Sequence, residues 1–272
     1  MPQRRRRPAH EDLPTHRPGI HLLANPHVAE RLIRSCAPCP GDLVVEFGAG
    51  LGAITTPLAR TGARVLAIER DAGFARRLRE RVADEPGVRI RVDDARTTPL
   101  PREPFLVAAS IPYAISSTLL RRLLTPASSR LRRAALIVEW GFAKRLTAEV
   151  PRTRELAWWA ARFDLELVHR IPARHFRPVP SVDSAHLVAR RRPGLGRGAQ
   201  AALWTLLGAA YGAPRTPARR VVPRTGRGRH RLLAEHGIDP AQPAGDVPPP
   251  RWASLATTLA SDRGLWFPPP PR

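Results

Sequence analysis

The feature that most limits how this chain can fold is a continuous apolar run that ends in a glycine-rich turn, "LVVEFGAGLG", at residues 43–52. An unbroken apolar run is typical of a parallel strand that is buried on both faces. The glycines Gly48, Gly50 and Gly52 predict a tight turn at which backbone and ligand approach each other closely. The spacing is G-x-G-x-G and not the G-x-G-x-x-G of dinucleotide folds, and a tight turn without a ligand is the alternative.

Further strands and helices alternate around this turn. Four more apolar runs predict strands at residues 64–69, 88–94, 104–110 and 133–139. Helical spacing of apolar residues occurs at residues 27–36, 54–62, 72–84, 117–125 and 140–150. Strands that alternate with helices at this spacing predict an α/β fold with a doubly wound parallel sheet. "DLELVHRI" and "SAHLVARRR" predict a final, partly antiparallel pair.

The pattern changes near residue 193, where short helical stretches separated by Pro- and Arg-rich loops begin. We therefore expect a basic disordered arm at residues 1–18, a main domain at 19–192 and a small helical domain at 193–272. The end, "FPPPPR", cannot continue a helix, and we expect it to be a frayed Pro-rich tail.

The charge of the chain is strongly one-sided. It has 45 Lys and Arg against 23 Asp and Glu, a net charge of +22. Such an excess favours binding to a polyanion such as nucleic acid. Each arginine tract taken singly is better explained as solvated surface charge, whereas the tracts taken together favour RNA binding. They lie at residues 4–7, 121–122, 132–133, 190–192 and 215–231.

The sequence contains no apolar run long enough for a membrane span and no apolar segment of a secretory signal near the N-terminus. We therefore predict a cytoplasmic protein without a membrane partner. The two cysteines, Cys36 and Cys39 in "CAPC", are interpreted as incidental, because a zinc site needs about four ligands and a redox motif normally opens a helix after a strand.

Polar residues follow the predicted strands at their carboxyl ends. Glu69 ends the second strand and is suited to accept both hydroxyls of a ribose. Asp94 ends the third and is a candidate partner for an adenine amino group, with a helix cap or a solvated acid as the alternative and Asp93 as a competitor. "SIPY", residues 110–113, follows the fourth strand. Ligands of open α/β sheets bind along this edge.

Together these motifs resemble the rRNA adenine N6-methyltransferases, which comprise the erythromycin-resistance methylases of 23S rRNA and the 16S rRNA dimethyladenosine transferases. The resemblance covers residues 19–190. "GIHLLANPHVAERLI" is similar to the leading segment of the family, and "EFGAGLG", "AIERD" and "VDDAR" are similar to its cofactor loops. "SIPYAI" resembles Asn-Ile-Pro-Tyr/Phe, "LIVEWGFAKRL" resembles a resistance-methylase block, and "HFRPVPSVDSA" resembles Phe-x-Pro-x-Pro-x-Val-x-Ser.

The resemblance implies a Rossmann-like S-adenosylmethionine-dependent methyltransferase fold with a small C-terminal helical domain that binds RNA. It implies that S-adenosyl-L-methionine is bound by His21, Leu23, Gly48, Gly50, Glu69, Asp94 and Ser110. The catalytic residues would be Ser110, Ile111, Pro112 and Tyr113, with no metal.

In this scheme the Tyr113 ring, rather than its hydroxyl, stacks on an adenine flipped out of the RNA. Ser110 and the Ile111 carbonyl accept hydrogen bonds from N6, and Pro112 fixes the turn. Ser110 and His21 replace the usual Asn residues of the family, and Trp140 replaces a Glu. Trp140 would either contact RNA or pack on a helix face.

The resemblance predicts N6-methylation of a specific adenine in 23S rRNA, naked or in pre-ribosomal particles, by a monomer. This would give resistance to macrolides, lincosamides and streptogramin B. One alternative is a 16S rRNA dimethyladenosine transferase, against which "LIVEWGFAKR" argues. The other is a non-catalytic RNA-binding protein with a degraded methyltransferase site.

Overall fold

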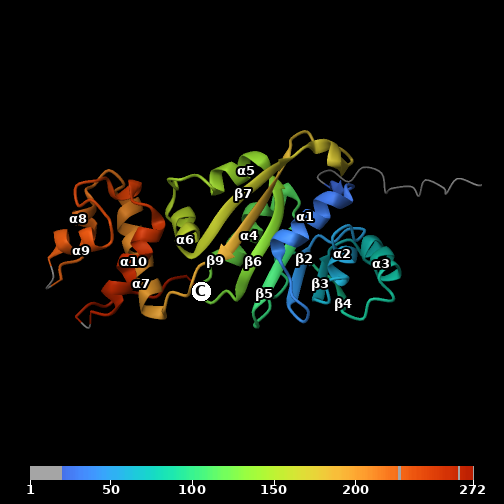
Figure 1. Ribbon diagram of the computed structural model, residues 1–272, viewed down its shortest axis with the longest axis horizontal. Coiled ribbons are helices and arrows are strands. Elements are labelled where there is room, and N and C mark those ends of the chain that lie inside the picture. The colour runs from blue at the N-terminus through green and yellow to red at the C-terminus, as the bar shows by residue number, and fades with distance from the viewer. Residues whose placement is uncertain (1–19, 226–227, 263, 272) are drawn as a thin grey trace, which may run out of the picture.

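A seven-stranded sheet forms the middle of the molecule (Figure 1). The computed structural model describes residues 20–225, 228–262 and 264–271, so the predicted arm at 1–18 lies outside the described residues. The strand order is β4-β3-β2-β5-β6-β9-β7. The strands are β2 (Leu43–Phe47), β3 (Arg64–Glu69), β4 (Val88–Val92), β5 (Phe105–Ser110), β6 (Leu131–Glu139), β7 (Phe163–Ile171) and β9 (Ser184–Arg191).

The strands β4, β3, β2, β5 and β6 are parallel, whereas β9 runs antiparallel to both β6 and β7. This arrangement confirms the doubly wound sheet and its partly antiparallel end. Successive strand residues face opposite sides, so Val44 and Val45 belong to different apolar clusters. Both sides are therefore buried, as the unbroken apolar runs predict.

Helices cover both faces of the sheet. α1 (Pro26–Cys36), α2 (Thr55–Ala59) and α3 (Ala72–Arg81) pack on one face. α4 (Ser116–Leu124), α5 (Trp140–Leu146) and α6 (Arg154–Arg162) pack on the other. Gly62, with a φ of +76°, follows α2 as expected for a helix end.

Sequence reasoning missed α6. Thr153 caps this helix by accepting a hydrogen bond from the Leu156 backbone N–H at 3.2 Å. Buried residues lie around most of its circumference, because α7 and α10 cover the side that the sheet leaves open; they include Ala157, Trp158, Trp159, Ala161 and Arg162. The buried side includes the charged Arg162, so charge does not mark the exposed side of this helix in the sequence.

The C-terminal part is helical, with α7 (Arg197–Gly212), α8 (Ala218–Val221), α9 (Arg229–Glu235) and α10 (Pro249–Ala260). The change from sheet to helices falls between β9 and α7. One apolar core nevertheless continues from the sheet through α6 into α7 and α10. The predicted boundary at residue 193 therefore coincides with a change of architecture, and separate domains at 19–192 and 193–272 stay a prediction.

The end of the chain is not frayed, in contrast to the expectation from its prolines. The Ala127 backbone N–H donates to the Pro271 carbonyl at 3.1 Å, and Leu265 and Phe267 pack against the core. An extended Pro-rich segment makes no internal hydrogen bonds, so its carbonyls remain available to other parts of the chain.

Cys36 is buried in α1, and its thiol donates to the Val107 carbonyl at 3.6 Å. Burial raises the pKa of Cys36 to about 12, which suits a packing role. Over the described ranges, the structure has no helix with the length and apolar character that a bilayer crossing requires.

Candidate cofactor pocket and catalytic turn

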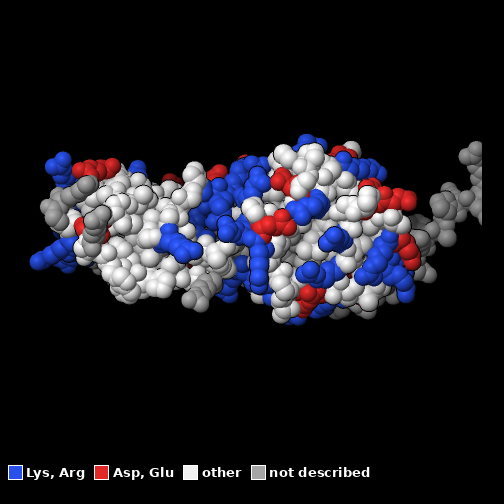
Figure 2. Space-filling view, turned by 90° about the horizontal axis from the view of Figure 1, so that it is seen from below, with Lys and Arg blue, Asp and Glu red and all other residues white. Residues whose placement is uncertain are grey.

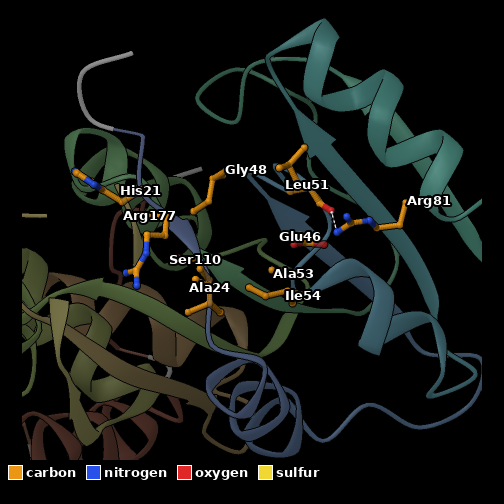
Figure 3. Close-up of a pocket in the computed structure, with 13 residues that line it drawn as sticks. His21, Ala24, Glu46, Gly48, Leu51, Ala53, Ile54, Arg81, Ser110 and Arg177 are labelled. Carbon is orange, nitrogen blue, oxygen red and sulfur yellow. Dashed lines mark hydrogen bonds between the residues drawn. The ribbon is translucent and has the colours of Figure 1, made fainter. Parts of the chain in front are cut away.

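A cavity of about 240 Å³ opens at the carboxyl edge of the sheet (Figure 3). It lies between the end of β2, the glycine turn, the end of β5 and a short strand, β1 (Leu22–Leu23). Four of the predicted cofactor residues line it, namely His21, Leu23, Gly48 and Ser110. The remaining lining residues are Leu22, Ala24, Glu46, Ala49, Leu51, Ala53, Ile54, Arg81 and Arg177.

A two-stranded sheet that the sequence did not reveal closes one side of the cavity. β1 pairs antiparallel with β8 (Phe176–Arg177), which belongs to the "HFRPVP" segment. His21 Nδ1 donates to the Pro178 carbonyl at 2.8 Å. Two segments that are far apart in the chain are thus joined beside the predicted cofactor loops.

The glycine turn has backbone conformations that favour glycine. Gly48 has a φ of +74°, and a Cβ there would lie 3.5 Å from Pro112 Cδ and 3.8 Å from the Ser110 carbonyl oxygen. Gly50 has a φ of +54°, and a Cβ there would lie 2.9 Å from Leu22 Cδ2. The glycine turn therefore lies between the "SIPY" turn and β1 and leaves little room for a side chain at Gly50.

Glu69 lies beside the glycine turn, outside the cavity lining. Its side chain is buried, with Oε2 accepting from the Gly50 N–H at 2.8 Å and Oε1 from the Asp71 N–H at 2.7 Å. Each carboxylate oxygen has capacity for a second hydrogen bond. Glu69 thus ties the turn to the end of β3, and its role toward a ribose stays a prediction.

Asp94 is held in a local turn and does not line the cavity. Its carboxylate forms an ion pair with Arg96 at 2.6 Å and accepts from the Arg96 backbone N–H at 2.8 Å. Arg96 holds the pKa of Asp94 at about 2. This geometry matches the alternative of a solvated turn acid, and an adenine contact of Asp94 stays a prediction. Asp93 donates its backbone N–H to the Glu69 carbonyl at 3.2 Å.

Glu46 is a lining residue that sequence reasoning missed. It is 1% exposed and accepts a hydrogen bond from Thr55 Oγ1 at 2.6 Å. Burial raises the pKa of Glu46 to about 8. Its signal in the sequence is a lone carboxylate inside an apolar strand, two residues before Gly48.

Arg81 reaches from α3 to the same side of the cavity and donates to the Leu51 carbonyl at 2.7 Å (Figure 3). A carboxyl group and a guanidinium are partners for the ammonium and carboxylate groups of an amino acid. A nearby ammonium would also favour ionisation of Glu46. The cavity therefore fits the methionine moiety of S-adenosylmethionine.

The "SIPY" turn is rigidly attached to the sheet. Ser110 ends β5, and the Ile111 N–H donates to the Ile137 carbonyl on β6 at 3.0 Å. The Pro112 carbonyl accepts from the Ile115 N–H at 3.0 Å and from Ser116 Oγ at 3.3 Å. A short 3-10 helix, η1 (Tyr113–Ile115), leads from the turn into α4.

The Tyr113 hydroxyl has a partner within the protein, and stacking of the ring on a base stays a prediction. Tyr113 Oη lies 2.7 Å from Ser184 Oγ at the start of β9, and Ser184 is fully buried. The Tyr113 and His21 ring centroids lie 6.1 Å apart. Sequence reasoning missed Ser184, although it is the serine that ends the "HFRPVPSVDSA" match.

Trp140 is partly buried at the start of α5 and packs against the core. Its backbone N–H donates to the Asp183 carbonyl at 3.0 Å, and the Arg170 guanidinium lies 5.4 Å from the ring centroid. These contacts favour the helix-face role over contact with RNA.

Comparisons with known proteins identify the family of the chain. The family model "Ribosomal RNA adenine dimethylase" matches residues 16–261. The rRNA adenine N-6-methyltransferase of Bacillus licheniformis is 34% identical over 174 residues, 64% of this chain and 61% of that protein. The rRNA methyltransferase of Streptomyces thermotolerans is 38% identical over 177 residues, 64% and 58% of the two chains. This chain thus spans less than two thirds of the length of these relatives.

A relative of the other class is the ribosomal RNA small subunit methyltransferase A of a Synechococcus species. It is 33% identical over 195 residues, 66% of this chain and 68% of that protein.

Among solved structures, the 23S rRNA methyltransferase ErmE matches with a TM-score of 0.74 and 26% identity, over 88% of this chain and 99% of that chain. A dimethyladenosine transferase from Plasmodium falciparum shares the fold, with a TM-score of 0.67, 21% identity and coverage of 86% and 96%. These matches confirm the Rossmann-like fold of S-adenosylmethionine-dependent methyltransferases with a helical C-terminal part. The family model spans most of the sequence, and the chain belongs to the ribosomal RNA adenine dimethylase family.

Proposed function

We propose that this protein transfers a methyl group from S-adenosyl-L-methionine to N6 of a specific adenine in 23S rRNA. The observation that carries the proposal is the contact between the glycine turn and the Ser110–Pro112 turn at one cavity. A methyl donor bound along the first turn and a base held at the second would meet there. The family match supports the reaction class.

The cofactor would be held by His21, Leu23, Gly48, Gly50 and Ser110, with Glu69 at the ribose and Asp94 at the adenine. Glu46 and Arg81 join these residues at the amino-acid end. The bound cofactor supplies an electrophilic methyl group on a sulfonium.

The residues of the second turn would position the base. Ser110 Oγ and the Ile111 carbonyl accept hydrogen bonds from the adenine amino group, whose lone pair is otherwise delocalised into the ring. Tyr113 stacks on the flipped base, and Pro112 fixes the turn. In the transfer the N6–C bond forms as the S–C bond of the sulfonium breaks, S-adenosylhomocysteine is the leaving group, and N6 releases one proton to solvent. The adenine amino group needs only to be oriented and brought close to the methyl group. Most of the rate acceleration therefore comes from positioning.

The match to ErmE supports 23S rRNA as the substrate, as do the relatives named rRNA adenine N-6-methyltransferase. On this proposal the modification gives resistance to macrolides, lincosamides and streptogramin B, and the enzyme acts in the cytoplasm as a monomer. The 16S rRNA is the second candidate, because the Synechococcus relative is named for the small subunit.

The helical part would contribute RNA contacts. A hollow of about 510 Å³ between α8 and α9 is lined by basic residues, namely Arg219, Arg220, Arg224, Arg229 and His230, together with Thr225 and Gly228. Clustered arginines of this kind suit phosphate groups.

The test is methyl transfer from labelled S-adenosylmethionine to naked 23S rRNA, naked 16S rRNA and pre-ribosomal particles, followed by mapping of the modified nucleotide. We expect methylation of one adenine in 23S rRNA. Methylation confined to 16S rRNA would instead establish the second candidate. Tight RNA binding without any transfer would establish a non-catalytic RNA-binding protein.

Ser110 provides a sharper test of the catalytic turn. Ser110→Ala should slow single-turnover transfer, because one hydrogen-bond acceptor for the amino group is lost, and Ser110→Asn should restore it. Ser117→Ala, at an exposed position on α4, is the matched control. An unchanged rate for Ser110→Ala would show that the Ser110 hydroxyl does not contribute and that the Ile111 carbonyl alone orients the amino group.

A further inference from the structure

Arginines from separate segments meet at the edge of the sheet opposite the cavity. The cavity lies at the end of the sheet where the parallel strands β2 and β5 finish. At the opposite end of the sheet, β6 begins and the antiparallel β9 finishes. In register, Arg133 of β6 faces Arg190 of β9, and the Phe105 N–H at the start of β5 donates to the Arg130 carbonyl at 3.2 Å. We call the group the amino-edge band; it consists of Arg102, Arg130, Arg132, Arg190, Arg191 and Arg192.

Figure 2 views the molecule from the side on which these strand ends lie in Figure 1. Basic side chains gather in a band across the middle of this face, beside the mostly uncharged surface of the helical part. The arginines at residues 121–122 do not belong to this band, because both already have partners within the protein. Arg121 pairs with Glu155, and Arg122 donates to the carbonyls of Ala95 and Thr98.

The loop at residues 124–131 that carries Arg130 is braced from beneath by two guanidiniums. Arg162 donates to the carbonyls of Leu124 at 2.7 Å and Pro126 at 2.9 Å. Arg191 donates to the carbonyls of Leu131 at 2.6 Å and Ser129 at 2.8 Å. The loop backbone is thereby fixed, so Arg130 is presented from a rigid support.

The charges of the band are only partly neutralised. Arg132 pairs with Asp42, while Arg190 and Arg192 share Asp164 and Arg190 also contacts Glu166. Within the described part of the chain, Arg102, Arg130 and Arg191 have no ion pair. Burial and the neighbouring Arg130 lower the pKa of Arg191, and burial and Arg191 lower the pKa of Arg162 to about 9. Like charges held this closely favour a bound anion, which would offset their repulsion.

We propose that the amino-edge band binds phosphates of an RNA segment other than the one that carries the target base. Guanidiniums spread along an edge match phosphates repeated along a nucleic-acid backbone. β6 has nine residues, which corresponds to about 30 Å between the two edges of the sheet. A small hairpin at the cavity would not reach the band, whereas a larger folded rRNA fragment would. The choice of RNA rests on the proposed function.

The test compares two RNAs and two variants. RNA binding is measured by fluorescence anisotropy without cofactor at several salt concentrations, and methyl transfer is measured separately with labelled S-adenosylmethionine. One RNA is a short hairpin with the target adenine, and the other is a longer 23S fragment that adds the flanking helices. The band variant is R102Q/R130Q, and the control is R77Q/R79Q on α3; all four arginines are exposed.

We expect the band variant to bind the longer fragment about 10-fold more weakly, with a slope of log K against log salt reduced by about 1.8. Its affinity for the hairpin, and its rate of methyl transfer to it, should equal those of the unsubstituted protein. The control should bind both RNAs normally.

Unchanged affinity for the longer fragment would overturn the proposal, and so would equal losses on both RNAs. Retained RNA binding with lost binding to anionic phospholipid vesicles would assign the band to a membrane surface instead. If the unsubstituted protein methylates neither RNA but the band variant still loses affinity for the longer fragment, the proposed reaction fails and the band stands.

Discussion

At the scale of single residues, Tyr113 is held by a hydrogen bond that no sequence motif predicted. Its hydroxyl meets the buried Ser184 Oγ at 2.7 Å, and the turn before it is bonded to the neighbouring strand. A ring that must stack on a base benefits from such a fixed orientation. On the proposed function, Ser184 is a positioning residue, because it acts through Tyr113.

We expect Tyr113→Phe and Ser184→Ala each to weaken transition-state positioning by about 0.5–1.5 kcal/mol, the usual net contribution of one hydrogen bond. Because both remove the same contact, the double variant should lose about as much as either single variant and clearly less than the sum of the two. Single-turnover rates and cofactor affinity, which should stay constant, provide the measurement.

Tyr211→Phe is the control, because in the described structure the buried Tyr211 hydroxyl has no hydrogen-bond partner. If Tyr113→Phe keeps the full rate and Tyr113→Ala loses most of it, the ring is sufficient without the hydrogen bond to Ser184.

Glu46 makes stability depend on pH. Its pKa is about 8 in the folded protein against an ordinary 4.5, so between these values the folded chain keeps a proton that the unfolded chain has lost. The contribution of Glu46 to stability is therefore full below pH 4.5 and declines as the pH rises toward 8. Each unit of pKa difference corresponds to about 1.4 kcal/mol.

Urea unfolding of the apo protein and of Glu46→Gln at pH 5 and pH 9 measures this effect. The difference in unfolding free energy between the two proteins should shift in favour of Glu46→Gln at the higher pH. Parallel pH profiles would mean that Glu46 is ionised in the folded protein.

At the scale of elements, α6 joins the sheet to the helical part. The Arg154 guanidinium lies 3.5 Å from the Trp204 ring centroid on α7, and it donates to the Trp204 carbonyl at 2.6 Å. The same tryptophan makes an edge contact with Trp158 of α6, with centroids 5.3 Å apart. These contacts couple α6 to α7 in addition to the shared apolar core.

Arg154→Ala should lower stability by about 1–2 kcal/mol, because both a cation–π contact and a hydrogen bond are lost. Thermal unfolding would detect this as a decrease in Tm of about 2–4 °C per kcal/mol. Arg152→Ala, two residues away at an exposed position, should leave Tm unchanged. Equal Tm values for the two variants would show that the apolar core alone joins the elements.

At the scale of the whole molecule, the two ends of the described chain return to the sheet. β1 closes the cofactor cavity at the carboxyl edge, and residue 271 reaches the loop before β6 at the opposite edge. The helical part therefore contacts the catalytic part through both α6 and the tail.

The tail can be tested with two adjacent aromatic residues. Phe267 packs against the core, whereas Trp266 is 81% exposed. Phe267→Ala should lower the free energy of unfolding by about 1–3 kcal/mol, because it removes apolar burial, and Trp266→Ala should change it by less than about 0.5 kcal/mol. Denaturant titration of both variants provides the measurement. Equal stabilities would indicate that the tail is frayed after all.

Local patterns in the sequence were sufficient for the strands and helices of the parallel part of the sheet and for four of the residues that line the cavity. The apolar runs of β2 and β3 and the glycines after β2 carry their signal within a few residues. Because the carboxyl ends of parallel strands meet at one edge, the sequence by itself was enough to assign Gly48 and Ser110 to one site, whereas His21 was assigned through the family resemblance.

Only the tertiary structure decided the contacts between distant segments. The pairing of β1 with β8, the Tyr113–Ser184 hydrogen bond and the position of α6 all depend on which surfaces pack together. The amino-edge band is of the same kind, because Arg130 and Arg191 become neighbours only when β9 inserts antiparallel beside β6. Periodicity along the chain reports which face of an element is apolar, but it does not report which partner covers that face.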